Sequence, residues 1–478
     1  MNTQSDQIDK LVEQVVRQVE DRLRAAKPTD TERWKPTSTI SFRERAGVFK
    51  TVDEAVAKAK EVAPAWAAYD KTKKNIAIEN IRRRLLEHNK ELSELAVRET
   101  GLGRAEDKLI KNALVTTKTP GTEILKPYTE TGPFGLMMTD FAPYGVIGSI
   151  TPTTNPSETI INNGIGMLAA GNTVVFNPHP SAKEVSARTV EIMNRAAEET
   201  GAPTPLLCSV SKPTIDSATE LMRHKDVRLL VVTGGPAVVR AAMNSGKKVI
   251  AAGPGNPPAV VDDTADIENA GRSIVRGSSL DNNIVCIVEK EVIALKTVVD
   301  PLKQAMQRNG AYYVNEKQRD RLEKVLVIDG HVNKDFIGKD AAVILREIGI
   351  SVGKEVRVVI CDATENHSFV QLEMLMPVLP VVAVDTFEEA IAMAKRVEHD
   401  FRHTAVIHSR NIERIHRMGR LMNCSLFVSN APSFAALAQE GEGYTSFTIA
   451  SPTGEGCTTA RHFSRERRFT IGGHLNMV

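Results

Sequence analysis

The segment Gly145-Val-Ile-Gly-Ser-Ile-Thr151 is a short, mostly apolar run that ends in the polar loop Pro152-Thr-Thr-Asn-Pro156. A helical stretch over 157–170 follows, is closed by Gly171, and leads into a second apolar run, Thr173-Val-Val-Phe176. A strand, a helix and a further strand in this order form the unit from which parallel sheets are built. The segment therefore predicts an α/β fold.

The same alternation extends outward on both sides. Upstream, residues 47–118 carry helical spacing, and 120–143 is typical of strands separated by turn residues. Downstream, a helix is expected over 182–199, and apolar runs follow at 206–210, 228–232 and 249–252. A second block runs from Pro258 to about Ala431, with strands expected near Val260, Val288, Val358, Val381, Ala405 and Phe427. Two α/β lobes with a cleft between them are expected.

Bulk composition excludes several classes of protein. The chain has 478 residues and a formal charge of only +2, so more than one domain is expected and nucleic acid is not an expected partner. No apolar run reaches the ~18–20 residues of a membrane span, and the charged N-terminus lacks a signal-peptide core. The five cysteines form no CxxC pair and no metal-ligand spacing. A soluble enzyme of the bacterial cytoplasm, without a metal, is expected.

The N-terminus is organised differently from the rest. Apolar residues recur at helical spacing over 5–24, opposite a charged face, and a polar stretch with Pro28 and Pro36 follows. We expect an amphipathic helix over 1–24 and a linker over 25–46. Its apolar stripe either docks on another molecule or packs on its own enzyme or a sister subunit.

Two positions could carry nucleophilic chemistry. Cys286 follows the polar turn 278–283 inside an apolar, strand-like run, where it is either a reactive thiol or an inert core residue. Cys457, in a glycine-rich loop, is its rival; Cys208, Cys361 and Cys424 fit a core role. Asn155, after the first strand, could donate to an oxyanion or act as a cap.

A third pattern concerns nucleotide binding. No GxGxxG follows a strand; the nearest substitute is the run 228–236, in which Thr233, Gly234 and Gly235 precede Pro236. This is either a phosphate-binding helix start or a plain tight turn.

Taken in chain order, these segments resemble the aldehyde dehydrogenase superfamily over roughly residues 45–478. The motifs that carry the likeness are Thr151-Pro-x-x-Asn155-Pro, Thr173-Val-Val-Phe-Asn-Pro178, Val232-Thr-Gly-Gly235, Gly253-Pro-Gly-Asn-Pro-Pro258, Cys286 and Glu373-Met-Leu-Met-Pro-Val378. Three segments resemble the CoA-acylating propionaldehyde dehydrogenases of bacterial microcompartments, the propanediol-utilisation type: Asn155-Pro-Ser-Glu-Thr-Ile-Ile-Asn-Asn163, Ser245-Gly-Lys-Lys-Val-Ile250 and Pro452-Thr-Gly-Glu-Gly456.

The resemblance implies roles for individual residues. Cys286 would be the catalytic thiol, and Asn155 with the Cys286 backbone N–H would stabilise the oxyanion. His403 would shuttle a proton or keep Cys286 as a thiolate; a hydrogen-bonded structural histidine is the alternative. The residues expected at the NAD site are Thr153, Pro178, His179, Thr233, Gly234, Gly235 and Glu373, with Glu373 on the nicotinamide ribose. For His179, a turn role competes with a phosphate contact.

Two departures from the hydrolytic branch of the superfamily are informative. Ala251 or Ala252 stands where hydrolytic enzymes carry the glutamate that activates water. Without that base, transfer of the acyl group to coenzyme A is favoured over transfer to water. Asn177 replaces the lysine that usually contacts the adenosine ribose, which leaves the choice between NAD and NADP open.

The expected activity is oxidation of a short aldehyde, propanal first and ethanal second, by NAD and coenzyme A through a Cys286 thioester. A hydrolytic aldehyde dehydrogenase, an acyl transferase or cysteine hydrolase, and a non-catalytic assembly protein of microcompartments are the alternatives. The family likeness also implies a cofactor-binding domain over 47–256, a catalytic domain over 257–445 and a C-terminal tail over 446–478.

The family likeness also makes a homo-oligomer, dimer or tetramer, the expected state, formed through a strand flap at 120–143 and the tail. The N-terminal helix resembles the encapsulation peptides of microcompartment enzymes. It implies a shell-protein partner and a place in the microcompartment lumen.

Overall fold

The structure is a computed structural model that describes residues 45–476. The helix expected over 1–24 and most of the linker lie outside the described residues. Among the residues that are described, no helix is both long enough and apolar enough to span a bilayer.

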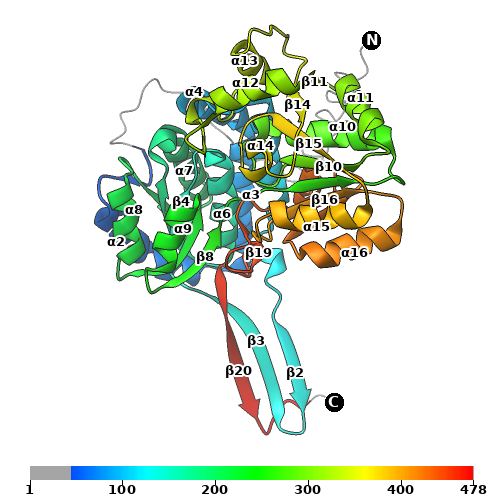
Figure 1. Ribbon diagram of the computed structural model, residues 1–478. Coiled ribbons are helices and arrows are strands. Elements are labelled where there is room, and N and C mark those ends of the chain that lie inside the picture. The colour runs from blue at the N-terminus through cyan, green and yellow to red at the C-terminus, as the bar shows by residue number, and fades with distance from the viewer. Residues whose placement is uncertain (1–44, 477–478) are drawn as a thin grey trace. The chain divides into compact units, whose positions relative to one another are not determined.

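The first lobe is built on a six-stranded sheet in which every pairing is parallel (Figure 1). The strand order is β1-β6-β5-β4-β7-β8, so β4 lies at the centre, where the winding reverses direction. The strands are β1 (Val48–Phe49), β4 (Val146–Thr151), β5 (Thr173–Pro178), β6 (Leu207–Val210), β7 (Val227–Thr233) and β8 (Lys248–Ala252). Ligands of such sheets bind beyond the carboxyl ends of the strands at the reversal point, which here lies beyond β4.

Helices cover both faces of this sheet. One face packs on α2 (Val52–Ala67), α8 (Ile215–Arg223) and α9 (Pro236–Met243), and the other on α6 (Pro156–Ala169) and α7 (Lys183–Glu198). Outside these lie α3 (Lys71–Glu87), α4 (Asn89–Thr100) and α5 (Ala105–Lys118). Every residue of α6 is buried, including Glu158, Asn162 and Asn163. Because buried polar groups need partners, this helix is held by specific side-chain contacts as well as by packing.

The second lobe contains a seven-stranded parallel sheet of order β11-β14-β15-β10-β9-β16-β17. Its strands are β9 (Pro258–Val261), β10 (Glu291–Leu295), β11 (Ala311–Val314), β14 (Val358–Asp362), β15 (Val378–Val384), β16 (Thr404–His408) and β17 (Leu426–Ser429). Helices α10 (Ile267–Ser278) and α11 (Val299–Arg308) pack on one face, and α15 (Phe387–Val397) and α16 (Ile412–Met422) on the other. The β11 end is covered by α12 (Glu316–Leu326), α13 (Ala341–Arg346) and α14 (Ser368–Gln371).

A three-stranded antiparallel flap extends from the two lobes (Figure 1). It consists of β2 (Tyr128–Gly132), β3 (Gly135–Pro143) and β20 (Ser464–Gly472), with β3 in the middle. Asn172 fastens its root: Oδ1 accepts from the backbone N–H groups of Tyr144 and Gly145, and Nδ2 donates to the Phe463 carbonyl at 2.8 Å. Two short hairpins, β12 (Val327–Ile328) with β13 (His331–Val332) and β18 (Ile449–Ala450) with β19 (Gly456–Cys457), complete the strands.

The two predicted α/β lobes are confirmed, and the strands and helices of the first block agree with expectation to within about two residues. Three details differ. The strand expected near Val288 begins only at Glu291, β11 was not predicted, and the helical run before Gly101 is divided at His88. Division of the chain into domains at 256–257 stays a prediction, although it falls between β8 and β9.

Candidate active site

The predicted site residues lie at opposite ends of the strands in the two sheets. Asn155 follows the carboxyl end of β4, and Thr233 is the last residue of β7, in the first sheet. Glu373, Cys286 and His403 all precede the amino ends of strands in the second, namely β15, β10 and β16. These three strands and β9 are consecutive neighbours in the sheet order, so their preceding loops lie together. The candidate site combines the carboxyl edge of one sheet with the amino edge of the other.

The loop before Cys286 has an unusual backbone. Asp281, Asn282 and Asn283 have φ of 49°, 54° and 67°, the left-handed region that Asn and Asp tolerate best among residues with a side chain. Their side chains are all anchored: Asn282 Nδ2 donates to the Gly338 carbonyl at 2.9 Å, and Asn283 Nδ2 to the Ser278 carbonyl at 2.7 Å. Left-handed residues do not continue into an extended strand, and Cys286 lies in a turn before β10. The expectation that Cys286 lies inside a strand is wrong.

Lys290 anchors the same loop through hydrogen bonds from its side chain. Its buried ammonium donates to the carbonyl and side-chain oxygens of Asn283 at 2.7 and 2.6 Å and to the Val285 carbonyl at 3.3 Å. Burial lowers the pKa of Lys290 to about 8, although the Glu373 carboxylate opposes this shift. The lysine therefore places a cation beside the peptide that carries the thiol.

Cys286 is partly exposed, unlike Cys208 and Cys361, which are fully buried. Burial and the Glu373 carboxylate raise the pKa of its thiol to about 12, while Lys290 and Lys111 oppose the rise. The protein alone thus keeps Cys286 as a thiol, and a base is needed to ionise it. For the rival Cys457, which pairs with Ile449 in the β18–β19 hairpin, burial raises the pKa to about 11.

Asn155 is the N-cap residue of α6, but its side chain makes no capping hydrogen bond. Instead its Oδ1 accepts from Lys111 Nζ at 2.5 Å, and its Nδ2 donates to Thr154 Oγ1 at 3.3 Å. The capping alternative for Asn155 is therefore not observed. One amide hydrogen is left for another acceptor.

His403 and the backbone carbonyl of Cys286 both lie beside Gly255. A Cβ added to Gly255 would be 2.7 Å from the Cys286 carbonyl oxygen and 3.0 Å from His403 Cγ, so both groups adjoin Gly255. Nδ1 contacts Thr404 Oγ1 at 2.8 Å, whereas Nε2 is buried with no hydrogen-bond partner among residues 45–476. Burial, with Lys290, lowers the pKa of His403 to about 4. A neutral imidazole with an open nitrogen can accept a proton but cannot supply a cation for a thiolate.

The residues expected to hold NAD are distributed around the edge of the first sheet. Gly235 is the N-cap residue of α9 and makes no side-chain cap, and an added Cβ there would meet nothing within 4 Å. The first amides of α9 are thus open to a phosphate. Glu373 is half-buried, and its Oε1 accepts from the Gly255 N–H at 3.3 Å. These features fit a dinucleotide.

The remaining predicted residues of this edge are less informative. Thr233 Oγ1 contacts Thr448 Oγ1 at 3.0 Å, and Thr153 lies in the loop between β4 and α6. Pro178 is the buried last residue of β5. His179 caps a short 3₁₀ turn by accepting from the Ser181 N–H at 3.1 Å, which agrees with the turn role.

Both departures from the hydrolytic branch fall on ordered, buried positions. Ala251 and Ala252 are buried in β8, and the backbone N–H of Ala251 donates to Thr453 Oγ1 at 3.0 Å. Asn177 is buried at the end of β5, where its Oδ1 accepts from Ser217 Oγ at 2.6 Å. Neither place offers a water-activating base, and the amide at 177 is already engaged.

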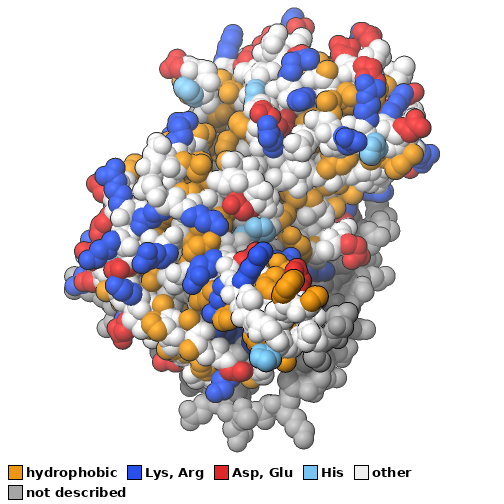
Figure 2. All heavy atoms as spheres, turned by 90° about the horizontal axis from the view of Figure 1, so that it is seen from below, with side chains coloured by type: hydrophobic (Ala, Val, Ile, Leu, Met, Phe, Trp, Pro, Cys, Tyr) orange, Lys and Arg blue, Asp and Glu red, His pale blue; other side chains and the backbone are white. Residues whose placement is uncertain are grey.

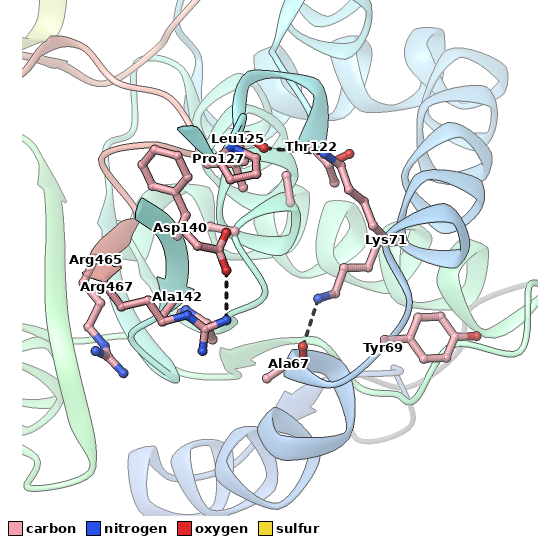
Figure 3. A pocket seen from close by; sticks show the side chains of 15 residues that line it. Ala67, Tyr69, Lys71, Thr122, Leu125, Pro127, Asp140, Ala142, Arg465 and Arg467 are labelled. Carbon is pink, nitrogen blue, oxygen red and sulfur yellow. Dashed lines mark hydrogen bonds and ion pairs between the residues drawn. The ribbon is translucent and has the colours of Figure 1, made fainter. Parts of the chain in front are cut away.

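A separate cavity of about 510 Å³ lies at the root of the flap (Figure 3). Tyr69, Asp140 and Arg467 line it, and Arg467 Nη2 pairs with Asp140 Oδ2 at 3.0 Å. None of the predicted site residues lines this cavity. It is therefore distinct from the site around Cys286.

The two α/β lobes and a partly exposed cysteine before β10 fit an enzyme that uses a thiol nucleophile. The model of the aldehyde dehydrogenase family matches residues 26–335 and 337–447, and the chain belongs to that family. Within it, the chain groups with CoA-acylating acetaldehyde and propanal dehydrogenases. It is 45% identical to an acetylating acetaldehyde dehydrogenase of Salmonella typhimurium, over 93% of this chain and 96% of the relative. It is 41% identical to a CoA-propanoylating propanal dehydrogenase of the same organism, over 91% and 94%.

Comparison with solved structures gives the same grouping. Propionaldehyde dehydrogenase of Rhodopseudomonas palustris, with bound CoA and an acylated cysteine, superposes with a TM-score of 0.89 at 43% identity, covering 92% of this chain and all of that one. An engineered glycolyl-CoA reductase with bound NADP+ gives the same TM-score, identity and coverage of both chains. A propionaldehyde dehydrogenase from a fucose-utilisation microcompartment of Clostridium phytofermentans gives 0.89 at 42% identity, covering 91% and 100%.

The neutral state of His403 predicts a pH-dependent stability. Below pH 6.5, the usual pKa of histidine, the imidazole is protonated in the unfolded chain, whereas the native imidazole stays neutral down to about pH 4. The free energy of unfolding of the wild type therefore decreases as the pH falls through this range. Replacing His403 by Leu should thus raise the free energy of unfolding, relative to wild type, by about 3 kcal/mol between pH 6.5 and 4. Chemical denaturation across this range measures it.

His408, at the other end of β16, provides a matched control. It is also buried, and burial lowers its pKa to about 4. His408→Leu should show the same pH-dependent gain while activity is retained, whereas His403→Leu should lose activity. A pH-independent difference for His403→Leu would show that the native imidazole is protonated.

Proposed function

We propose that this chain converts a short aliphatic aldehyde to its acyl-CoA through a thioester on Cys286, with propanal preferred over acetaldehyde. The observation that carries the residue assignment is that the Cys286 backbone carbonyl and the His403 ring both adjoin Gly255, with His403 Nε2 left open. A nucleophile and a neutral base in one part of the molecule are what acyl transfer between thiols requires. NAD, when bound, supplies the acceptor for the hydride.

The chain's own residues would act in sequence. Cys286 passes its proton to His403 Nε2, from which it is released to solvent, and the thiolate adds to the aldehyde carbonyl, while Asn155 Nδ2 and the Cys286 N–H donate to the oxygen. Loss of hydride from this adduct leaves an acyl thioester on Cys286. His403 Nε2 then takes the proton of the CoA thiol, whose sulfur attacks the thioester, and Cys286 leaves as thiolate. One thioester replaces another, so the exchange is close to balanced in energy.

Capture of the acyl group by water is the main alternative. It needs a base aimed at a water molecule, and the position used for this in hydrolytic relatives is occupied by Ala251 and Ala252 in β8. A general base contributes ~10²–10⁴-fold to such a step. The alkyl side chains therefore support transfer to a thiol, which is nucleophilic without this help.

We expect NADH formation from propanal and NAD to be sustained only when CoA is present, with propionyl-CoA as product and a higher kcat/KM than for acetaldehyde. The Cys286→Ala enzyme should be inactive, whereas Cys457→Ala, lacking the rival thiol, should retain activity. Steady NADH formation without CoA would indicate a hydrolytic enzyme, and turnover without NAD would indicate an acyl transferase or hydrolase.

A second copy of the chain is proposed to cover the flap. Exposed apolar side chains gather on this small sheet, and Phe134 at the β2–β3 turn is 91% exposed. Figure 2, which views the molecule from the flap side, shows hydrophobic side chains interspersed with Lys and Arg. The cavity at the flap root lies beside the same surface. A patch of this kind is typical of a subunit interface.

Replacing Phe134 by Asp should therefore shift the enzyme from a dimer or tetramer toward monomer in sedimentation velocity. Ile412→Asp on α16, also at an exposed apolar residue, is the matched control and should leave the sedimentation coefficient unchanged. Equal behaviour of both variants and wild type would place the interface elsewhere.

Residues 1–24 are proposed to direct the enzyme into a microcompartment by binding a shell protein. The support is the amphipathic pattern of the sequence and the microcompartment source of the Clostridium phytofermentans relative. In this proposal, the present enzyme oxidises its aldehyde in the lumen of a microcompartment, within the bacterial cytoplasm.

Removing residues 1–24 from the full chain should abolish co-sedimentation with purified shells and leave kcat unchanged. Leu11→Asp with Val15→Asp, on the apolar stripe, should have the same effect, because both changes remove the docking surface. Undiminished co-sedimentation of both variants would mean that the helix packs on its own enzyme or subunit.

A further inference from the structure

Lys111, in α5, is a buried lysine that contacts the proposed oxyanion donor directly. Its side chain is 1% exposed, and its ammonium lies 2.5 Å from Asn155 Oδ1, 2.6 Å from Asp281 Oδ2 and 2.9 Å from Glu158 Oε1. The two carboxylates raise the pKa of Lys111 against the effect of burial, so the side chain is a cation. The proposed mechanism assigns no role to this group.

The ammonium determines which way the Asn155 amide faces. A lysine ammonium only donates, so the atom of Asn155 that it contacts must be the carbonyl oxygen. An inverted amide would set N–H groups against N–H groups in a buried place, which is strongly unfavourable. With Oδ1 held, Nδ2 faces away from Lys111, and its second hydrogen has no acceptor among residues 45–476.

The cation also strengthens the donor. Hydrogen bonds in series polarise one another in a low-dielectric interior, so a charge on Oδ1 draws electrons from Nδ2. A second observation also places Lys111 near the site, because its charge acts on the Cys286 thiol. Both effects would increase the stabilisation of a negative oxygen at Nδ2.

We propose that Lys111 is a positioning residue that prepares Asn155 to donate to the oxyanion, a role that rests on the proposed function of Asn155. Lys111 does not touch the substrate. It acts by fixing the orientation and the polarity of one amide, and Asp281 and Glu158 hold it in place.

A variant that tests this role must not leave the buried carboxylates without a cation. Lys111→Met alone leaves Asp281 and Glu158 with only Lys108, and this variant can fail to fold. Lys111→Met with Glu158→Gln removes one cation and one anion together, and the Lys108–Asp281 pair at 2.9 Å remains balanced. This double variant is made in the wild-type and in the Asn155→Ala background, and its melting temperature is measured beside its kinetics.

In the wild-type background, kcat for NADH formation should fall ~10–100-fold, no more than the ~10²–10³-fold lost with one whole oxyanion donor, while KM for CoA is unchanged. In the Asn155→Ala background, the same pair of changes should have no further effect on kcat. A loss that persists there would overturn the proposal, because it would reach the reaction through the thiol or the fold. An unchanged kcat in the wild-type background would overturn it as well.

Lys108→Met with Glu158→Gln is the matched control, because it also removes one cation and one anion and leaves the Lys111–Asp281 pair. Lys108 is buried in the same network and donates to the Thr154 carbonyl at 3.1 Å, but it does not contact the Asn155 side chain. Its effect on kcat should therefore multiply with that of Asn155→Ala. If Asn155→Ala itself leaves kcat intact, the oxyanion role of Asn155 fails, and that outcome is distinct from failure of Lys111 alone.

Discussion

The carboxylate of Asp281 joins the two lobes at the point where the chemistry is proposed to take place. It is buried, and it lies 2.9 Å from Lys108 Nζ and 2.6 Å from Lys111 Nζ, both of them also buried. These lysines lower the pKa of Asp281 against the effect of burial, so the interaction is between full charges. Removing any one partner would leave a charge in a low-dielectric interior, which is strongly destabilising. The network therefore fixes α5 of the first lobe against the Cys286 loop of the second, and the rest of the site is assembled around it.

The site lies between the carboxyl edge of the first sheet and the amino edge of the second, and each edge supplies a different kind of group. Beyond the carboxyl ends of β4 and β7, the chain supplies an amide and an open helix start, which suit an oxyanion and a phosphate. Before the amino ends of β10, β15 and β16, it supplies the thiol, a carboxylate and an imidazole. Lys290 lies among the second set, and its charge acts on Cys286, Glu373 and His403 alike. One buried cation thus influences the ionisation of the three groups at once.

Sequence patterns predicted the two lobes and most strands, because parallel sheets are buried on both faces and their strands form recognisable apolar runs. They failed at Cys286, where an apolar run suggested a strand. Ile284, Val285 and Ile287 are buried in the core without being in a strand, and periodicity cannot distinguish these cases. Lys108, Lys111 and Lys290 were not predicted as site residues either. A lysine is usually solvated, whether on a helix, as Lys108 and Lys111 are, or in a loop, as Lys290 is, and only the tertiary contacts reveal that these three are buried. The family likeness supplied the remaining assignments, since no local pattern associates Asn155 with Cys286.

The flap has a consequence for the order in which the protein is made. Its central strand, β3, pairs along its whole length with β20, and the Asp140–Arg467 pair joins residues 327 positions apart. During translation β3 therefore emerges long before its partner and presents an open edge while both lobes are being synthesised. Such an edge is a template for pairing with other chains, and on a polysome the nearest chains are identical copies. Ribosome-bound chains of this protein are thus exposed to strand exchange until the last strand is released, and chaperone capture would be most valuable in that interval.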